Sequence, residues 1–167
     1  MKNGGLLIVG AGQFGIMVKE LALETGAFSK VDFLDDSSPL AIGKTEELDR
    51  FVFDYGYAIC AIGNPKARER ITEKIIGCGY KLARIISPRA YVSPSATVEE
   101  GVIIEPMAVV QRGAYVGKCS IVSSGAVLRH DSRLGNMCHA DCGCVILSNS
   151  SVPDCVKVEC LTVFKNN

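Results

Sequence analysis

The C-terminal half of the chain repeats with a period of six residues, and this period constrains the fold more than any other feature. Residues 90–167 divide into thirteen consecutive hexads with no insertion. The third position of each hexad is a branched aliphatic residue except at Ala140 and Phe164, and the first position is small in nearly every hexad. A short, regular repeat of this kind is typical of a solenoid, in which neighbouring coils share one core.

A hexad has room for one short strand and one turn. The large third residue is expected to point into a narrow interior, and the small first residue is expected to fit beside it. Stacked coils would then pair their backbone amides with those of the next coil. Since a single coil buries nothing, the stack is the folding unit. We therefore expect residues 90–167 to form a parallel β-helix.

The N-terminal half alternates between strand and helix patterns instead. The predicted elements, in order, are a strand over 4–9, a helix from Ile16 to near Gly26, strands over 31–34 and 58–62, an amphipathic helix over 67–78 and a strand over 82–86. Such alternation predicts a small Rossmann-like parallel α/β domain. We place this domain at residues 1–87 and the β-helix domain at residues 88–167, with Ser87, Pro88 and Arg89 as a hinge.

A glycine motif in the N-terminal half indicates a phosphate-binding turn. Gly10, Gly12 and Gly15 follow the first strand and open the first helix, where backbone amides can approach a phosphate. Asp35 and Asp36 end the second strand about 20 residues further on, as in NAD-binding folds. Only one half of a dinucleotide fold precedes the repeats, which favours a nucleotide-linked substrate. NAD binding and a purely structural glycine turn remain as alternatives.

Charge and hydropathy exclude several partners. The chain has 18 Lys and Arg against 18 Asp and Glu, with no basic stripe, so nucleic acid and anionic membranes are not expected as partners. No apolar run approaches the length of a membrane span. With no export signal, the eight cysteines are interpreted as reduced thiols in the cytoplasm.

Three cysteines flank one of the two histidines of the chain. Cys138, Cys142 and Cys144 surround His139, but their spacing is not that of a zinc site. Cys138 and Cys144 share the first hexad position, where other hexads have Ala, Ser or Thr. We interpret them as small hydrophobic residues and expect no metal.

A small α/β domain followed by hexapeptide repeats resembles the bacterial sugar O-/N-acyltransferases, of the sialic acid O-acetyltransferase and UDP-4-amino-sugar N-acetyltransferase type. The resemblance covers nearly the whole chain. It rests on residues 8–15, 33–36, 61–64 with Arg68, and 129–131 followed by His139. It implies a left-handed β-helix with three hexads per coil, here about four coils, and a homotrimer that binds acetyl-CoA between neighbouring helices.

The resemblance also implies an activity and a set of site residues. The activity is acetyl transfer from acetyl-CoA to an amine or hydroxyl of a sugar nucleotide, for bacterial surface glycans. His130 matches the catalytic base, Asp131 its supporting carboxylate, and His139 a contact to the acyl donor. His139 is expected to replace a turn residue beside inward-facing Ala140. The substrate-binding residues of the N-terminal domain are expected to be Gly12, Gln13, Phe14, Asp35, Asp36, Gly63 and Asn64.

Other readings of these residues remain open. His130 can be a solvated turn histidine, and His139 can have an interface or structural role. The chain has Phe14 where the family often has His, reads Ala-Asp-Cys-Gly over 140–143 where the family often has Ala-Pro-Gly, and ends soon after His139. These departures favour an alternative function, a non-catalytic trimeric sugar-nucleotide-binding protein without a CoA site. A third possibility is an NAD-dependent sensor or reductase.

Overall fold

The computed structural model describes residues 4–166, and the chain divides into two compact units, Met1–Ile85 and Ile86–Asn167. The first unit contains β1 (Leu6–Val9), α1 (Gln13–Glu24), β2 (Val31–Leu34), the 3-10 helix η1 (Thr45–Phe51), α2 (Val52–Tyr55), β3 (Tyr57–Cys60), α3 (Pro65–Gly77) and β4 (Lys81–Leu82).

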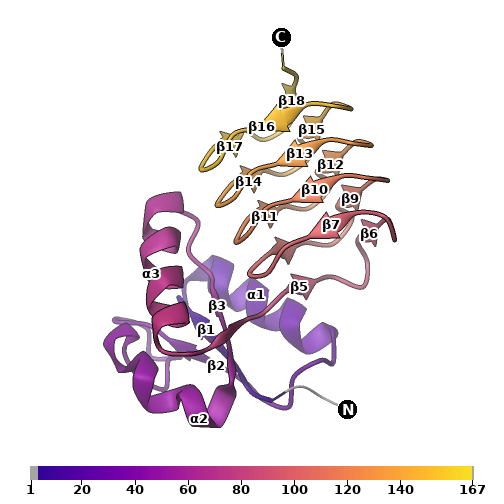
Figure 1. The fold of residues 1–167 in the computed structure, drawn as a ribbon. Coiled ribbons are helices and arrows are strands. Elements are labelled where there is room, and N and C mark those ends of the chain that lie inside the picture. The colour runs from indigo at the N-terminus through magenta and orange to yellow at the C-terminus, as the bar shows by residue number, and fades with distance from the viewer. Residues whose placement is uncertain (1–3, 167) are drawn as a thin grey trace. The chain divides into compact units, whose positions relative to one another are not determined.

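The strands of the first unit form one parallel sheet in the order β2-β1-β3-β4. The chain moves from β1 to β2 in one direction and from β3 to β4 in the other. Right-handed crossovers therefore place α1 and α3 on opposite faces of the sheet (Figure 1). This confirms the predicted parallel α/β fold. The carboxyl ends of β1 and β3 meet where the strand order reverses, which is where ligands bind in such sheets.

Two parts of this unit differ from the prediction. The segment Thr45–Tyr55, which forms η1 and α2, has no apolar stripe, since it buries only Leu48 and Tyr55. Its helical structure was therefore not predicted. The single strand expected over 82–86 is two strands, β4 and β5 (Ile85–Ile86), which belong to different sheets.

The second unit is a stack of two-residue strands on three faces (Figure 1). The β5 face contains β5, β8 (Ile103–Ile104), β11 (Ile121–Val122), β14 (His139–Ala140) and β17 (Lys157–Val158). The β6 face contains β6 (Tyr91–Val92), β9 (Val109–Val110), β12 (Val127–Leu128), β15 (Val145–Ile146) and β18 (Val163–Phe164). The β7 face contains β7 (Thr97–Val98), β10 (Tyr115–Val116), β13 (Arg133–Leu134) and β16 (Ser151–Val152).

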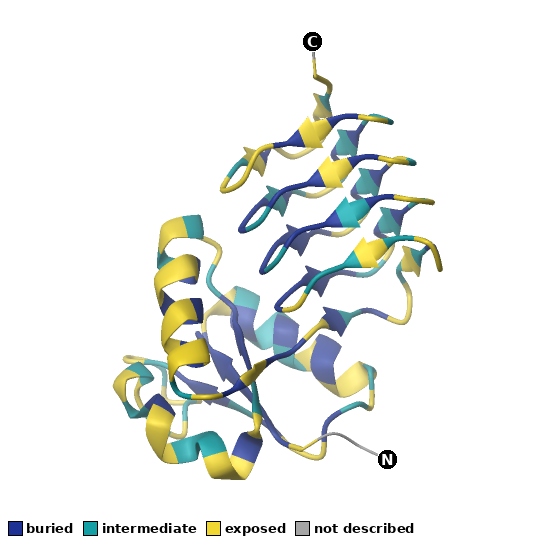
Figure 2. Cartoon of the chain, viewed as in Figure 1, coloured by how far each residue is buried: buried dark blue, intermediate teal, exposed yellow. Residues whose placement is uncertain are grey.

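The register confirms three hexads per coil. Val122 pairs with Ile104 in the coil before it and with Ala140 in the coil after it, so residues 18 apart stack. The third hexad positions form the buried column, and the small first positions pack into the same core. Figure 2 shows the buried residues of the coils in dark blue and the exposed residues in yellow, both at the corners and on strands such as β7, β13 and β16.

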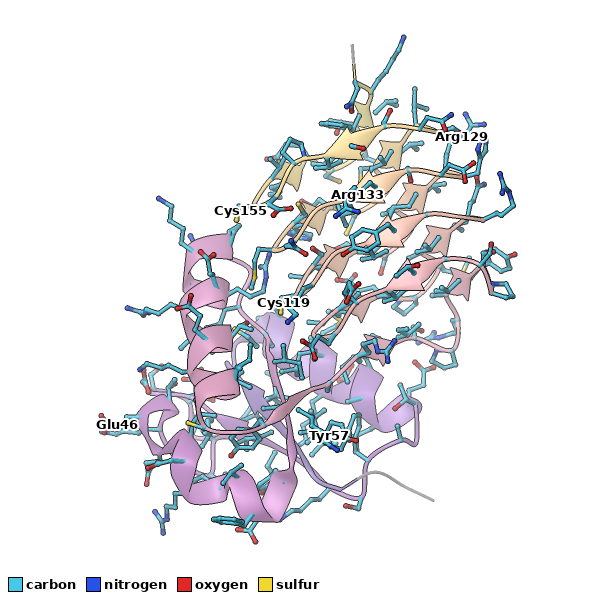
Figure 3. All side chains as sticks on the ribbon, in the orientation of Figure 1. Glu46, Tyr57, Cys119, Arg129, Arg133 and Cys155 are labelled. Carbon is cyan, nitrogen blue, oxygen red and sulfur yellow. The ribbon has the colours of Figure 1, made fainter. Side chains whose placement is uncertain are left out.

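The corners are four-residue turns that run from the fourth residue of one hexad to the first residue of the next. In most hexads the first residue donates its N–H to the carbonyl of the fourth residue of the previous hexad, as from Ala96 to Ser93 at 2.9 Å. The sixth position has positive φ in four glycines and in seven other residues: Met107, Cys119, Asp131, Met137, Asn149, Cys155 and Leu161. A type II turn requires this conformation at its third residue. Cys119 and Cys155 mark one such corner in Figure 3.

The first corner corrects the predicted hinge. Ser87 donates its N–H to the carbonyl of Ile104 at 2.9 Å, and Ala90 donates to Ser87 at 3.0 Å. Residues 87–90 are therefore the first turn of the β-helix. The hexad that starts at residue 84 was missed because its first position is Arg84, where the repeat elsewhere has a small residue.

All eight cysteines are free thiols. Cys138 and Cys144 are fully buried at first hexad positions, as predicted, and burial raises the pKa of the Cys144 thiol to about 11. Across residues 4–166, no helix combines the length and the apolar character that crossing a membrane requires.

Candidate active site

The first unit has a cleft of about 510 Å³ at the carboxyl ends of its strands. Its lining combines the loops after β1, β2 and β3 with one side of α3. The charged residues that line it are Asp35, Asp36, Lys44, Glu46, Arg70 and Lys74. Figure 3 labels Glu46 on η1 at the margin of this unit. The cleft therefore offers cations for phosphates and carboxylates for N–H or O–H donors.

The Asp35 carboxylate accepts hydrogen bonds from three backbone N–H groups. Its Oδ2 accepts the N–H of Ala11 at 2.8 Å, and its Oδ1 accepts the N–H groups of Ser37 and Ser38, each at 2.9 Å. The Ala11 bond is the main cause that lowers the pKa of Asp35 below its ordinary value. Asp35 thus ties the glycine loop after β1 to the end of β2.

Asp36 is the carboxylate that remains for a ligand. It is exposed, and its Oδ1 accepts the N–H of Thr45 at 2.9 Å, which fixes its orientation at the cleft. Within residues 4–166, no hydrogen bond reaches its second oxygen, Oδ2. Of the two predicted acidic residues, Asp36 is therefore better suited to contact a substrate.

The fold requires glycine at two of the three positions of the motif and not at the third. Gly10 has a φ of +107°, and a side chain on Gly15 would collide with the carbonyl of Gly10, so the fold requires both. Gly12 has a φ of −74°, and an added Cβ would meet nothing within 4 Å. Nothing in the fold requires glycine at residue 12. Its small size instead leaves room for a ligand at the N-terminus of α1.

The remaining predicted substrate residues lie at the same edge of the sheet but do not line the cleft. Asn64 caps α3, since its Oδ1 accepts the N–H of Ala67 at 3.0 Å. The buried guanidinium of Arg68 donates to the carbonyls of Ile62 and Gly63 at 2.9 and 2.8 Å and so fixes this loop. The other two, Gln13 and Phe14, begin α1, with Gln13 exposed and Phe14 half-buried.

The second unit carries His130 and Asp131 in the turn between β12 and β13. The Nδ1 atom of His130 lies 3.1 Å from Oδ2 of Asp131, and the His130 side chain is 44% exposed. A carboxylate can only accept a hydrogen bond, so Nδ1 carries the proton and Nε2 of the neutral ring carries the lone pair. This is the arrangement of a general base oriented by a carboxylate.

The turn is held by residues one coil earlier, which the sequence did not identify. Arg112 donates to the same Oδ2 of Asp131 at 2.9 Å, and Gln111 accepts the N–H of His130 at 3.0 Å. Gly113 stacks directly below Asp131, where any Cβ would collide with its carboxylate. Because residues 18 apart stack, the sequence repeat could have identified Gly113 as the neighbour of Asp131 in the coil before it.

His139 lies on strand β14, so the expectation that it replaces a turn residue is wrong. As the second residue of its hexad it points outward, while Ala140 points into the core. Its Nε2 lies 2.9 Å from the hydroxyl of Ser123 and 3.8 Å from Oδ1 of Asp141. Burial disfavours the charge on Asp141, but Lys157, the Cys142 N–H and His139 together lower its pKa.

The structure does not bring the two histidines of one chain together. His130 occupies the corner between the β6 and β7 faces, whereas His139 lies on the β5 face.

Comparisons with known proteins found matches for both units. Residues 5–75 match the family described as the PglD N-terminal domain. The acetyltransferase domain of PglB from Neisseria gonorrhoeae FA1090 is 27% identical with a TM-score of 0.75, and the match covers 98% of this chain and 92% of that chain. The same domain in complex with acetyl coenzyme A is 27% identical with a TM-score of 0.71, covering 96% and 93%.

A more distant structure shares the fold. It is a variant of perosamine N-acetyltransferase from Caulobacter crescentus in complex with CoA and GDP-perosamine, 22% identical with a TM-score of 0.59, and the match covers 96% of this chain and 91% of that chain. Residues 5–75 thus match the PglD N-terminal domain, and over nearly its whole length the chain is similar to the acetyltransferase domain of PglB.

Proposed function

We propose that this protein transfers an acetyl group from acetyl-CoA to the amine of a nucleotide-activated amino sugar, in the synthesis of a bacterial surface glycan. The observation that carries the proposal is the exposed imidazole of His130, whose Nδ1 is held by Asp131 on a turn of the β-helix. The similarity to the PglB domain that was solved with acetyl coenzyme A supports this choice of acyl donor. The proposed location is the cytoplasm, the compartment that supplies acetyl-CoA.

The chemistry follows from the lone pair on Nε2. The sugar amine attacks the thioester carbonyl carbon and forms a C–N bond. Nε2 of His130 accepts the proton that the amine loses, and the C–S bond then breaks. The departing thiolate takes up that proton and leaves as CoA, while the Asp131 carboxylate stabilises the imidazolium in between.

The proposal divides the substrates between the two units. The sugar nucleotide binds residues 1–87, with phosphates near Lys44, Arg70 or Lys74 and the N-terminus of α1, and with Asp36 accepting from the base or ribose. The acyl donor binds residues 88–167, with His139 as one contact.

The alternative of a non-catalytic binding protein receives less support. That alternative rests on the small number of residues that follow His139. However, the matched PglB domain in complex with acetyl coenzyme A is covered over 93% of its length. The match therefore includes nearly the whole of the PglB domain, which was solved in complex with acetyl coenzyme A.

The direct test measures transfer and binding separately. The purified protein is incubated with acetyl-CoA and a panel of UDP-, GDP- and CMP-linked amino sugars, and released CoA thiol and acetylated sugar are measured. Melting temperatures with each ligand alone report binding, because ligands that bind only the native state raise its apparent stability. A protein that binds a sugar nucleotide but neither binds acetyl-CoA nor releases thiol would be the non-catalytic alternative.

Gly12→Val is expected to weaken sugar-nucleotide binding by about tenfold or more, because the side chain blocks the approach of a phosphate to the N-terminus of α1. The fold should tolerate it, since residue 12 has extended backbone and open space around its Cβ. Isothermal titration measures both ligands, and acetyl-CoA affinity should not change. Gly77→Val, at another open glycine position, is the control. Equal loss of both ligands in Gly12→Val would contradict the placement of the nucleotide.

The proposed assembly is a homotrimer built on the β6 face. Its outward residues are apolar on every strand: Tyr91, Val109, Val127, Val145 and Val163. The outward residues of the β7 face include Thr97, Arg133 (labelled in Figure 3) and Ser151 instead. Arg133 lies 3.9 Å over the ring of Tyr115. A continuous apolar stripe of this kind favours burial against other copies. Since His130 lies two residues after the end of β12, this packing would put it near a subunit boundary.

Val127→Glu is expected to convert the trimer to monomers at micromolar concentration, because three carboxylates would face one another in an apolar interface. Sedimentation equilibrium measures the mass. Ser151→Glu, on the β7 face, should leave the trimer intact. A wild-type monomer, or a Val127→Glu trimer as stable as wild type, would show that the stripe is not the interface.

A further inference from the structure

A buried carboxylate on the β5 face belongs to no part of the site described so far. Glu105, in the corner after β8, is only 8% exposed. Its Oε2 accepts the N–H and the hydroxyl of Ser124 at 2.8 and 2.9 Å, and its Oε1 accepts the hydroxyl of Ser123 at 3.0 Å. Three donors satisfy this carboxylate, so its orientation is fixed.

The Ser123 hydroxyl links Glu105 to His139. Ser123 has one proton, and the carboxylate at 3.0 Å can only accept it. The Ser123 oxygen must therefore accept from His139 Nε2, which lies 2.9 Å away. Nε2 of His139 then carries a proton in both the neutral and the charged ring.

We infer that Glu105 is a positioning residue that acts through Ser123 to hold the His139 ring in place with its proton on Nε2. The inference rests on the proposed function only in that His139 contacts the acyl donor. The hydrogen-bond direction itself follows from the chain Glu105–Ser123–His139. The two neutral rings therefore carry their proton on different nitrogens: Nε2 in His139, and Nδ1 in His130, where Asp131 accepts it.

Glu105→Gln reverses this chain without changing its shape. The two donors of Ser124 hold the amide oxygen at the former Oε2 position, which leaves the amide NH₂ facing Ser123. The Ser123 oxygen then accepts from the amide, and its proton turns toward His139. Neutral His139 is expected to move its proton from Nε2 to Nδ1.

Nitrogen-15 NMR of the histidine rings tests the proton position without any substrate. The chain has only two histidines, so the spectra are simple, and His130→Ala assigns them. Above the titration of both rings, wild type should show Nε2–H for His139 and Nδ1–H for His130. In Glu105→Gln only the His139 pattern should invert. Glu99→Gln, at the same hexad position on another corner, is the matched control. An unchanged Nε2–H pattern in Glu105→Gln, or Nδ1–H in wild type, would overturn the inference.

Steady-state kinetics test the link to the acyl donor. In Glu105→Gln the KM for acetyl-CoA should rise about 5- to 10-fold, as expected for one displaced hydrogen bond, with the KM for the sugar nucleotide unchanged. Ser123→Ala should give a similar rise, and Ser123→Thr should restore the wild-type value because it keeps the hydroxyl. A shift of the proton with no change in the acetyl-CoA KM would overturn the positioning role. A further outcome would separate the two claims: the wild type transfers no acetyl group, while Glu105→Gln still moves the His139 proton from Nε2 to Nδ1. That result would refute the proposed function and leave the hydrogen-bond assignment standing.

Discussion

His130→Ala is expected to lower the turnover number for acetyl transfer by about 10²-fold or more, because the base acts mainly in the transition state. Melting temperature and the affinities for both substrates should change little. The side chain is half-exposed, and the turn is also held by hydrogen bonds that its backbone makes, including the one that the His130 N–H donates to Oε1 of Gln111. Single-turnover measurements with the true acceptor separate chemistry from binding.

The control is Glu100→Ala, at the same hexad position on a different corner, which should keep full activity. Asp131→Asn should have a smaller effect than His130→Ala, since the imidazole remains and asparagine tolerates the positive φ of residue 131. Full activity in His130→Ala would exclude the general-base role. The Asp131 carboxylate would then be a structural group that pairs with Arg112.

The coil architecture was predictable because each hexad repeats the same physical requirement. A large third residue must be buried and a small first residue must fit beside it, so the period fixes which residues stack. The same rule explains the one hexad that was missed. Arg84 breaks the small first position, although Ile85 and Ile86 still form a strand of the β5 face.

The candidate site was predictable only where its residues are neighbours in sequence. His130 and Asp131 are adjacent, and their contact was expected. The contacts of Arg112 with Asp131 and of Glu105 with Ser123 cross between coils, 19 and 18 residues apart. The stacking period brings such residues close, but side-chain direction decides whether they bond.

The acidic pair after β2 shows the same limit. Asp35 and Asp36 have identical chemistry and adjacent positions, so sequence alone does not rank them. The structure separates them by their hydrogen bonds, because both line the cleft but Asp35 accepts three backbone N–H groups whereas Asp36 accepts one. Which of two adjacent carboxylates meets these N–H groups depends on their placement in three dimensions.

Val122→Asp is expected to destabilise the β-helix by several kcal/mol, enough to unfold it at ordinary temperatures. Val122 is fully buried, and its strand lies between those of Ile104 and Ala140. The substitution removes about 1.5–3 kcal/mol of apolar burial. It also places a carboxylate in the aliphatic column, where an unpaired charge costs several kcal/mol more. The sum approaches the total stability of about 5–15 kcal/mol that is typical of a domain.

Chemical denaturation of the purified variant measures this loss, with Thr97→Asp at an exposed outward position as the charge-matched control. If Val122→Asp does not accumulate in folded form, Val122→Thr provides the graded measurement. It keeps the shape and replaces one methyl group with a hydroxyl, so its loss of stability should fall between wild type and the aspartate variant. Wild-type stability in Val122→Asp would mean that residue 122 does not face the core. Since a one-residue shift moves every side chain of a strand to the other face, that result would also overturn the hexad register that places His130 at a corner and His139 on the outer surface of a strand.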